Sequence, residues 1–334
     1  MPASADGTTD PGVDLDRAVR TAVERLGGLV ADGGLAELQV PLGPLTTYRV
    51  GGPAAVFARV GRADLPRVAA AVHDSGLPLL LVGRGSNMLV ADAGFPGLAV
   101  TVVPGARDQG TDEIVIDTAT SSVTAGAGVA LPVLARKTAA SGLTGFEWAV
   151  GVPGSVGGAV RMNAGGHGSD MAACLADVLV ADLATVPCEE RVLEVDAIGL
   201  GFRSSALPAT TIVLTARLQL RPGDPAVSKR LIDEIVAWRR ANQPGGQNAG
   251  SVFVNPVPGE VTCGALIEAA GLRGLRLGTA TVSDKHANFI QADEGGSADD
   301  VRALMDLVAA RVADHSGYRL RTEIRLVGFE EGAD

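Results

Sequence analysis

Two glycine-rich segments, at residues 83–87 and 151–168, constrain the fold of this 334-residue chain more than any other feature. The first reads Gly-Arg-Gly-Ser-Asn and follows an apolar run at 79–82 that predicts a buried strand. The second places many residues without side-chain bulk in one stretch. Glycine adopts left-handed backbone conformations and allows a close approach of other groups to the main chain. We therefore expect both segments to be loops whose backbone lies against a neighbour.

The hydrophobic pattern around these segments predicts two successive blocks of mixed helices and strands, which is the pattern of an α/β protein. The first block has a helix at 63–75 and strands at 56–60, 79–82 and 98–103. The second has a helix at 131–141 and strands at 114–116, 123–125, 178–183, 192–195 and 212–220. Outside the blocks, the pattern predicts helices at 14–30, 228–240 and 297–315 and a final strand at 320–327.

The best candidate for a domain boundary is the turn cluster Pro-Gly-Asp-Pro at 222–225, which separates a predicted strand from a predicted helix. We therefore predict three parts. A leader and N-terminal helix occupy residues 1–44, and a C-terminal domain occupies 223–330. Between them, residues 45–222 form a two-lobed ligand-binding domain, with lobes at about 45–105 and 106–222.

Charge and cysteine content exclude several classes of function. The chain has 28 Lys and Arg against 38 Asp and Glu, a net charge of -10, which argues against nucleic acid or an anionic membrane as the partner. The three cysteines lack CxxC spacing and the four histidines form no HxxxH pair, so we expect neither a disulfide framework nor a metal site. Neither a signal peptide nor a spanning segment is present in the pattern, so we expect a cytoplasmic protein.

The glycine segments match neither of the two common nucleotide loops. No Gly-Lys-Ser/Thr follows residue 83, and residues 88–91 lack the third glycine of the Rossmann fingerprint. Taken alone, the segment at 83–87 is more typical of an ordinary turn than of a ligand loop. The segment at 151–168 is equally typical of a crowded crossing between lobes. Their occurrence together in one chain favours a dinucleotide ligand that lies against backbone over a long distance.

Five short motifs, in order, carry a family resemblance: Thr-Thr-Tyr-Arg-Val-Gly-Gly at 46–52, Gly-Arg-Gly-Ser-Asn at 83–87, Gly-Val-Pro-Gly-Ser-Val-Gly-Gly-Ala at 151–159, Gly-Ser-Val-Phe at 250–253 and Ala-Asn-Phe at 287–289. Over about 45–328 the chain resembles the UDP-N-acetylenolpyruvoylglucosamine reductase family, and the uninterrupted run at 277–290 resembles its shorter, type II branch. The resemblance implies a two-lobed FAD-binding domain of the vanillyl-alcohol-oxidase type at 45–222. An α/β substrate-binding domain at 223–330 would follow it.

The resemblance also implies an activity. Family members use NADPH to reduce FAD, and the flavin then reduces the enolpyruvyl ether of UDP-N-acetylglucosamine to UDP-N-acetylmuramate, an early step of peptidoglycan synthesis. The expected partner is therefore this small-molecule substrate, with no nucleic acid, membrane or metal. We expect the protein to be a monomer or a weak homo-oligomer.

Site residues follow from the same resemblance, position by position. Ser251 would donate the proton to the α-carbon, Arg203 would pair with the substrate carboxylate, and Glu323 would assist there. Asn255 and His286 are expected to bind substrate. The residues expected to hold FAD come from the glycine segments and the C-terminal strand: Gly83, Arg84, Gly85, Ser86, Asn87, Val152, Pro153, Gly154, Ser155, Gly157, Gly158, Ala164, Gly165 and Arg325.

Each catalytic candidate has a structural alternative, since Ser251 could be a loop residue, Arg203 a surface cation and Glu323 an outward residue of the last strand. The chain also departs from the family pattern: Phe202 stands where many relatives have tyrosine, and Val254 and Asn242 stand where lysine is common. These departures leave two alternatives open. One is a flavin oxidoreductase of the same fold acting on another substrate, and the other is a flavin-binding protein without turnover.

Overall fold

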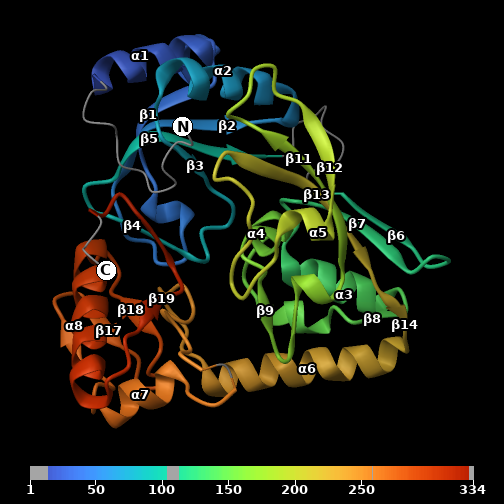
Figure 1. Ribbon diagram of the computed structural model, residues 1–334, viewed down its shortest axis with the longest axis vertical. Helices are drawn as coiled ribbons and strands as arrows, with labels where there is room; N and C mark the ends of the chain where they lie inside the picture. Colours follow the sequence, from blue (N-terminus) through green and yellow to red (C-terminus); the bar gives the residue numbers. More distant parts are fainter. Residues whose placement is uncertain (1–13, 104–112, 258, 331–334) are drawn as a thin grey trace. The chain divides into compact units, whose positions relative to one another are not determined.

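The structure, a computed structural model, describes residues 14–103, 113–257 and 259–330 (Figure 1). Its packing divides the chain into two compact units. Unit 1 lies within residues 1–38, 55–84 and 96–239, and unit 2 within 39–54, 85–95 and 240–334. The packing therefore does not divide at the turn cluster 222–225. Helix α6 (Pro225–Asn242) belongs to unit 1 up to Arg239, because Ile232 and Ile235 are buried in a core of that unit. The predicted functional domains stay a prediction.

The first part of unit 1 is a four-stranded sheet with two helices. The strands run in the order β1 (Ala36–Pro41), β2 (Pro53–Val60), β5 (Phe95–Val102) and β3 (Leu79–Leu81). Helices α1 (Leu15–Arg25) and α2 (Leu65–Ser75) share one buried core with β2 and β5. Helix α1 is shorter than the predicted 14–30, because its end is set by Gly27 and Gly28, both with positive φ.

The second part of unit 1 is an antiparallel sheet. Its five strands run in the order β12 (Glu190–Glu194), β11 (Leu175–Asp182), β13 (Thr211–Gln219), β7 (Ser122–Gly126) and β6 (Ile114–Asp117). Helices α3 (Leu131–Ala140), α4 (Val156–Arg161) and α6 contribute buried side chains to the same core. This part of unit 1 also contains five short elements: α5 (Val195–Ile198), β8 (Leu143–Thr144), β14 (Arg221–Pro222), β9 (Gly165–Gly166) and β10 (Ser169–Asp170). The mixed α/β fold predicted from the two blocks is confirmed.

Unit 2 packs short strands against two helices, α7 (Cys263–Ala269) and α8 (Ala298–Ser316). Helix α8 confirms the prediction at 297–315: the Ser297 side chain caps its start by accepting from Asp300 N at 3.1 Å, and Gly317 ends it with a φ of 77°. The strands are β4 (Met88–Val90), β15 (Phe253–Val254), β16 (Arg276–Leu277), β17 (Ala280–Val282), β18 (Ile290–Ala292), β19 (Arg321–Thr322) and β20 (Arg325–Val327).

The prediction of one continuous strand at 320–327 is wrong. The chain forms two short strands here, β19 and β20, that pair with different partners. Strand β19 pairs antiparallel with β15, whereas β20 pairs parallel with β4. Because no single straight strand satisfies both ladders, the chain changes partner at Glu323 and Ile324, and one of the predicted catalytic residues stands at that change.

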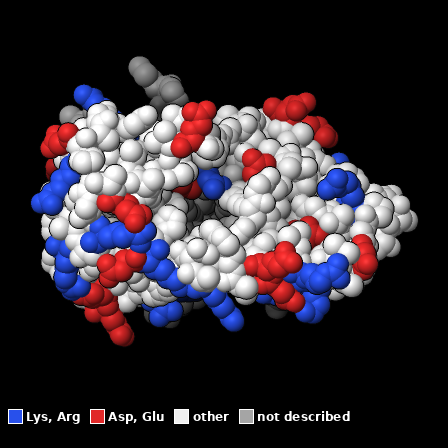
Figure 2. Space-filling model, turned by 90° about the horizontal axis from the view of Figure 1, so that it is seen from below, with Lys and Arg blue, Asp and Glu red and all other residues white. Residues whose placement is uncertain are grey.

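None of the helices in the described part of the chain combines the length and the apolar character needed to cross a membrane. On the face shown in Figure 2, basic and acidic side chains are interspersed rather than gathered by sign. Exposed ion pairs contribute to this pattern, among them Arg273 with Glu268 at 2.8 Å and Arg302 with Asp306 at 2.9 Å. Recognition of an anionic ligand therefore has to rest on local groups.

A buried carboxylate, Glu147, joins helix α6 to the segment that precedes the second glycine loop. Its side chain accepts hydrogen bonds from Ser228 Oγ at 2.6 Å, Thr144 Oγ1 at 2.7 Å and Gly145 N at 2.8 Å. Burial alone raises the pKa of Glu147, but the hydrogen bonds from Ser228, Thr144 and the backbone together outweigh it and leave the pKa below its ordinary value. The carboxylate is therefore ionised and stabilises unit 1.

We expect Glu147→Gln to lower the free energy of unfolding of unit 1 by about 2 kcal/mol at neutral pH, the scale of hydrogen bonds to a charged group. Because the folded pKa is lowered, this stabilisation is present above the ordinary glutamate pKa and is lost as the pH falls through the folded pKa. Urea unfolding followed by tryptophan fluorescence measures it, since Trp148 and Trp238 both belong to unit 1. The exposed Glu234→Gln is the matched control, and equal stability of the two variants across the pH range would contradict the assignment.

Candidate functional site

The start of the first predicted glycine loop, residues 83–84, lies beside the second loop within unit 1. Arg84 Nε donates to Pro153 O at 3.4 Å, and a Cβ built on Gly83 would stand 3.2 Å from Ser155 Oγ. Gly83 follows strand β3 and Pro153 precedes helix α4, so segments about seventy residues apart meet at these positions. The sequence predicted each loop separately, and the structure brings residues 83–84 and 153–155 together.

The second loop is held by a neighbouring backbone segment. Leu131 N donates to Gly154 O at 3.1 Å, and Gly157 N donates to Ala127 O at 2.9 Å. A Cβ on Gly157 would stand 2.9 Å from the Cβ of Ala127, closer than real side chains approach. Only glycine fits at position 157, so the loop keeps its exposed backbone close to the 127–131 segment.

The remainder of the first loop, residues 85–87, belongs to unit 2 and rests on the first motif. Gly85 has a φ of 57°, and a Cβ there would stand 2.2 Å from Leu45 O. Thr47 N donates to Gly85 O at 3.1 Å. The motif at 46–52 therefore supports the turn at Gly85, which explains structurally why the two motifs occur together.

Ser251 and Glu323 are brought together in unit 2 by strand pairing. Strand β15, which begins two residues after Ser251, pairs with β19, which ends one residue before Glu323; Phe253 lies opposite Thr322. Beyond the ladder, Glu323 N donates to Val252 O at 2.8 Å. The residues next to Ser251 are thus hydrogen-bonded to Glu323, although the two predicted catalytic residues are far apart in the sequence.

Asn87, at the end of the first glycine loop, bonds to both sides of the break between β19 and β20. Its Nδ2 donates to Glu323 O at 3.2 Å, and its backbone oxygen accepts from Arg325 N at 3.0 Å. Both contacts lie within unit 2. Asn87 and Arg325, two residues predicted to hold the cofactor, therefore lie next to the predicted catalytic Glu323.

Asn288 holds the Ser251 segment, a role that sequence reasoning missed. Its buried side chain accepts from Phe253 N at 3.0 Å and donates to Phe253 O at 2.9 Å, and its backbone oxygen accepts from Val252 N at 2.9 Å. In the sequence, Ala-Asn-Phe at 287–289 indicates the family resemblance but not a structural role for Asn288. The available signal was an amide inside an apolar run, which needs buried partners.

Asn255 and His286, the two predicted substrate residues, both have contacts inside unit 2. Asn255 Oδ1 accepts from Cys263 N at 2.9 Å at the start of helix α7. His286 Nδ1 accepts from Asn288 N at 3.3 Å, and burial, followed by the charge of Arg273, holds the pKa of this imidazole below its ordinary value. His286 is therefore neutral near pH 7, and the substrate role of both residues stays a prediction.

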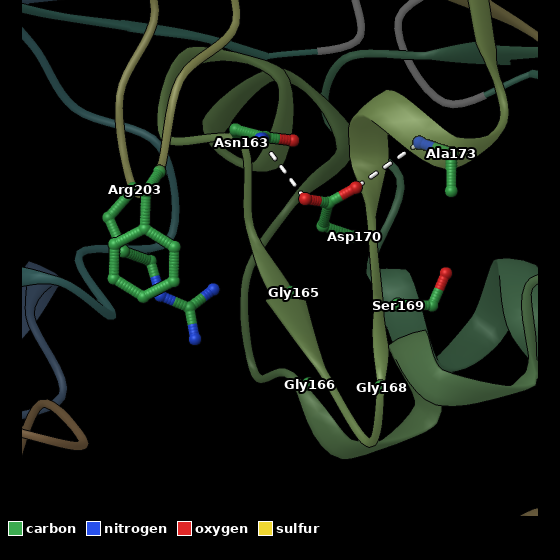
Figure 3. A pocket seen from close by; sticks show the side chains of 9 residues that line it. Asn163, Gly165, Gly166, Gly168, Ser169, Asp170, Ala173 and Arg203 are labelled. Carbon is green, nitrogen blue, oxygen red and sulfur yellow. Dashed lines mark hydrogen bonds between the residues drawn. The ribbon is translucent and has the colours of Figure 1, made fainter. Parts of the chain in front are cut away.

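Arg203, the third catalytic candidate, belongs to unit 1. It stands in a tight turn closed by Gly201 N donating to Ser204 O at 2.9 Å, and its own φ is 56°. The turn lines a pocket of about 350 Å³ together with Asn163, Asp170 and the β9–β10 hairpin (Figure 3). Figure 3 shows the guanidinium beside this hairpin, which contains the predicted cofactor residue Gly165. The arginine therefore lines a pocket and is not an isolated surface cation.

Within the described ranges, no three histidine, cysteine or acidic side chains are grouped closely enough to hold a metal ion. The cysteines Cys174, Cys188 and Cys263 are all free thiols. Burial raises the pKa of the Cys174 thiol to about 12 and that of Cys263 to about 11, the latter also through the charge of Glu323. Both thiols are protonated at neutral pH, which does not favour a thiolate nucleophile.

Comparison with known proteins gives a consistent result. A family model described as the C-terminal domain of UDP-N-acetylenolpyruvoylglucosamine reductase matches residues 242–327, and an FAD binding domain model matches 53–186. A UDP-N-acetylenolpyruvoylglucosamine reductase of Synechococcus sp. is 41% identical over 90% of this chain and 95% of its own length. One of Heliobacterium modesticaldum is 41% identical over 88% and 91%.

A solved structure agrees with the sequence relatives. The crystal structure of the UDP-N-acetylenolpyruvylglucosamine reductase from Thermus caldophilus superposes with a TM-score of 0.71 at 33% identity, covering 87% of this chain and 98% of that one. The match extends over both parts of the chain that the two family models cover. With motifs, sequence relatives and fold in agreement, the chain belongs to the UDP-N-acetylenolpyruvoylglucosamine reductase family.

Proposed function

We propose that this protein is an FAD-dependent enzyme that uses NADPH to reduce the enolpyruvyl ether of UDP-N-acetylglucosamine to UDP-N-acetylmuramate, for peptidoglycan synthesis. Family membership supports the reaction. The observation that carries the proposal is the pairing of β15 with β19, which holds the segments of Ser251 and Glu323 together through the bond from Glu323 N to Val252 O. A proton donor and a glutamate that act on the same enolpyruvyl group need this proximity.

The glycine loops fit the expected FAD. Gly83 and Gly158 are exposed backbone positions without a side chain, and a side chain at Gly83 would fill the space beside Ser155. Backbone amides of such loops suit a pyrophosphate, and they do so in a chain of net charge -10. We propose that residues 83–87, 152–155, Gly157, Gly158, Ala164, Gly165 and Arg325 hold the cofactor. When bound, FAD supplies the hydride that the enolpyruvyl double bond accepts.

Ser251 is proposed to deliver the proton to the α-carbon of the substrate. A serine hydroxyl is a weak acid, so its position and its neighbours have to compensate. Asn288 fixes the segment from 252 to 253 by three hydrogen bonds, and Glu323 is bonded to the same segment. This support fixes the backbone next to Ser251, which lowers the entropic cost of placing its hydroxyl for proton transfer.

Arg203 and Glu323 are proposed to act at the substrate carboxylate. Reduction of the enolpyruvyl group places negative charge on the carboxylate side of the double bond, and a guanidinium stabilises such charge through paired N–H donors. Glu323 is proposed to assist at the same carboxylate. The position of Arg203 in a lined pocket supports this role.

We also propose that the enzyme works in the cytoplasm as a monomer or a weak homo-oligomer. Its three cysteines are all unpaired, as is usual for proteins of a reducing compartment. The substrate and NADPH are both small molecules, so no macromolecular partner is required for the reaction.

The proposed function is tested by NADPH oxidation by the purified, FAD-loaded protein. We expect rapid NADPH consumption only when UDP-N-acetylglucosamine enolpyruvate is added, with UDP-N-acetylmuramate as the product detected by mass spectrometry. Flavin-loaded protein that shows no substrate-dependent turnover would favour another substrate. Protein that cannot be loaded with FAD would contradict the proposed reductase and also a flavin oxidoreductase that acts on another substrate.

The loop geometry predicts that Gly83→Val weakens FAD binding. A Cβ at this position stands 3.2 Å from Ser155 Oγ, and the methyl groups of valine would occupy the exposed face of the loop that is proposed to contact the cofactor. We expect a loss of about 1–3 kcal/mol in binding free energy, which is typical of overpacking. Titration of the apoprotein, followed by quenching of flavin fluorescence, measures it. Gly245→Val is the control, because no atom lies within 4 Å of a Cβ there; equal FAD affinity of the two variants would refute the assignment.

A further inference from the structure

Backbone strain is concentrated around the pocket of Figure 3. Six described residues other than glycine have a positive φ, and three of them are Asn163 at 39°, His167 at 51° and Arg203 at 56°. Asn163 and Arg203 line the pocket, and His167 lies at the tip of the hairpin that lines it. Such conformations cost about 1–3 kcal/mol each and persist only where surrounding contacts enforce them. The contacts that enforce the conformation of Arg203 therefore bear on its function.

The turn that carries Arg203 has little support of its own. Gly201 and Ser204 exchange two backbone hydrogen bonds, at 2.9 and 3.3 Å, and Arg203 occupies the left-handed position between them. The ring of Phe202 is 55% exposed and lies with its centroid 5.5 Å from Arg203 Cζ. A short turn that holds an arginine at a positive φ depends on contacts with neighbouring elements to keep one conformation.

Asn163 provides that anchor. Its Nδ2 donates to Asp170 Oδ2 at 3.2 Å (Figure 3). The same Nδ2 donates to Gly201 O at 2.9 Å, and Oδ1 accepts from Ala172 N at 3.0 Å. Asp170 in turn accepts from Ala173 N at 3.2 Å. The Asn163 residue is only 5% exposed, so these bonds are shielded from water. One amide thus joins the Arg203 turn to the β9–β10 hairpin on the other side of the pocket.

Only an amide of this length can make this set of bonds. Donation to Gly201 O and acceptance from Ala172 N require a donor and an acceptor on the same short side chain. Aspartate keeps the shape but has no donor for either Gly201 O or Asp170. Asparagine also tolerates a positive φ better than other residues with a Cβ.

We propose that Asn163 is the positioning residue for Arg203: through Gly201 O it fixes the turn so that the guanidinium is held in the pocket, ready to pair with a carboxylate. The inference rests on the proposed function, in which that carboxylate belongs to the enolpyruvyl group. Asn163 itself has no contact with the reacting atoms in this account and acts through Arg203.

The test is a double-mutant cycle of Asn163→Asp and Arg203→Lys on FAD-loaded protein. Two quantities are measured: the Kd of UDP-N-acetylglucosamine enolpyruvate without NADPH, by calorimetry, and kcat/KM with NADPH. With Arg203 in place, we expect Asn163→Asp to raise the Kd and to lower kcat/KM, each by about 10- to 100-fold, as for other supporting residues. In the Arg203→Lys background we expect less than about a threefold effect, because the group that Asn163 positions is already lost.

Gln219→Glu is the matched control. Gln219 Nε2 also donates to backbone carbonyls of unit 1, at Thr120 and Ser121, so the control makes the same chemical change at a side chain that does not line the pocket. We expect it to leave Kd and kcat/KM unchanged. Asn163→Gly serves as a second variant should the aspartate fail to fold, because glycine accepts the positive φ while it removes the anchor.

Three results would overturn the inference: equal losses from Asn163→Asp in both arginine backgrounds, a wild-type Kd for the folded Asn163 variants, or no measurable binding of the enolpyruvate to the wild type. Failure of the proposed function has a different signature, since a wild-type protein that binds the enolpyruvate but does not turn it over refutes the reaction while the binding cycle still decides the role of Asn163.

Discussion

Ser251→Ala is expected to lower the rate of substrate reduction by about a thousandfold, within the range typical for loss of a general acid. The reduction of bound FAD by NADPH is expected to stay at the wild-type rate, because that step needs no proton on the substrate carbon. The segment that follows Ser251 is fixed by Asn288 and by the pairing of β15 with β19, so removing the hydroxyl leaves the backbone in place. Stopped-flow absorbance of the flavin measures the two half-reactions separately.

Two further variants sharpen this result. Ser251→Cys keeps a proton at nearly the same position and is expected to retain more activity than the alanine variant. Ser316→Ala removes a hydroxyl that donates to Val312 O at 2.7 Å in helix α8 and should leave both half-reactions unchanged. Equal loss of both half-reactions in Ser251→Ala would contradict its role as the proton donor.

Arg203→Lys is expected to lower kcat/KM for the enolpyruvyl substrate by about 10- to 100-fold, the equivalent of one or two hydrogen bonds to a charged group. Lysine keeps the charge but loses the planar set of donors, so it cannot form a two-point contact with a carboxylate. The substitution also removes the guanidinium that lies 5.5 Å from the centroid of the Phe202 ring. Flavin reduction by NADPH should be unaffected.

Steady-state kinetics with each variant tests this second prediction. Arg62→Lys is the control, because Arg62 pairs with Glu190 in unit 1 and lines no part of the pocket. An Arg203→Lys enzyme with wild-type kcat/KM would show that the guanidinium does not contact the substrate. A variant that loses FAD instead would show that Arg203 supports the cofactor and not the carboxylate.

The fold was predictable where local signals decide it. Helix α8 could be located from its Ser297 cap and its apolar face, and the first glycine loop from the strand that precedes it. The break between β19 and β20 could not be predicted, because the alternating pattern at 320–327 suits one strand and the change of partner depends on β15 and β4. Likewise, α6 follows a turn cluster in sequence but packs through Ile232 and Ile235 into unit 1.

The candidate site shows the same limit. Family motifs gave the identities of Ser251, Arg203 and Glu323, but the contact between the Ser251 and Glu323 segments depends on strand register, which the sequence does not specify. Asn163 and Asn288 escaped sequence reasoning for a related reason. A buried amide is recognised by its partners, and Gly201 lies 38 residues from Asn163 while Phe253 lies 35 residues from Asn288.

The central claim is most directly tested by an anaerobic two-step experiment on the FAD-loaded protein. One equivalent of NADPH is added first, and loss of the absorption band of oxidised flavin reports its reduction. UDP-N-acetylglucosamine enolpyruvate is then added without further NADPH. The account predicts rapid return of the oxidised flavin band with one equivalent of UDP-N-acetylmuramate formed. A reduced flavin that is not reoxidised by this compound would contradict it.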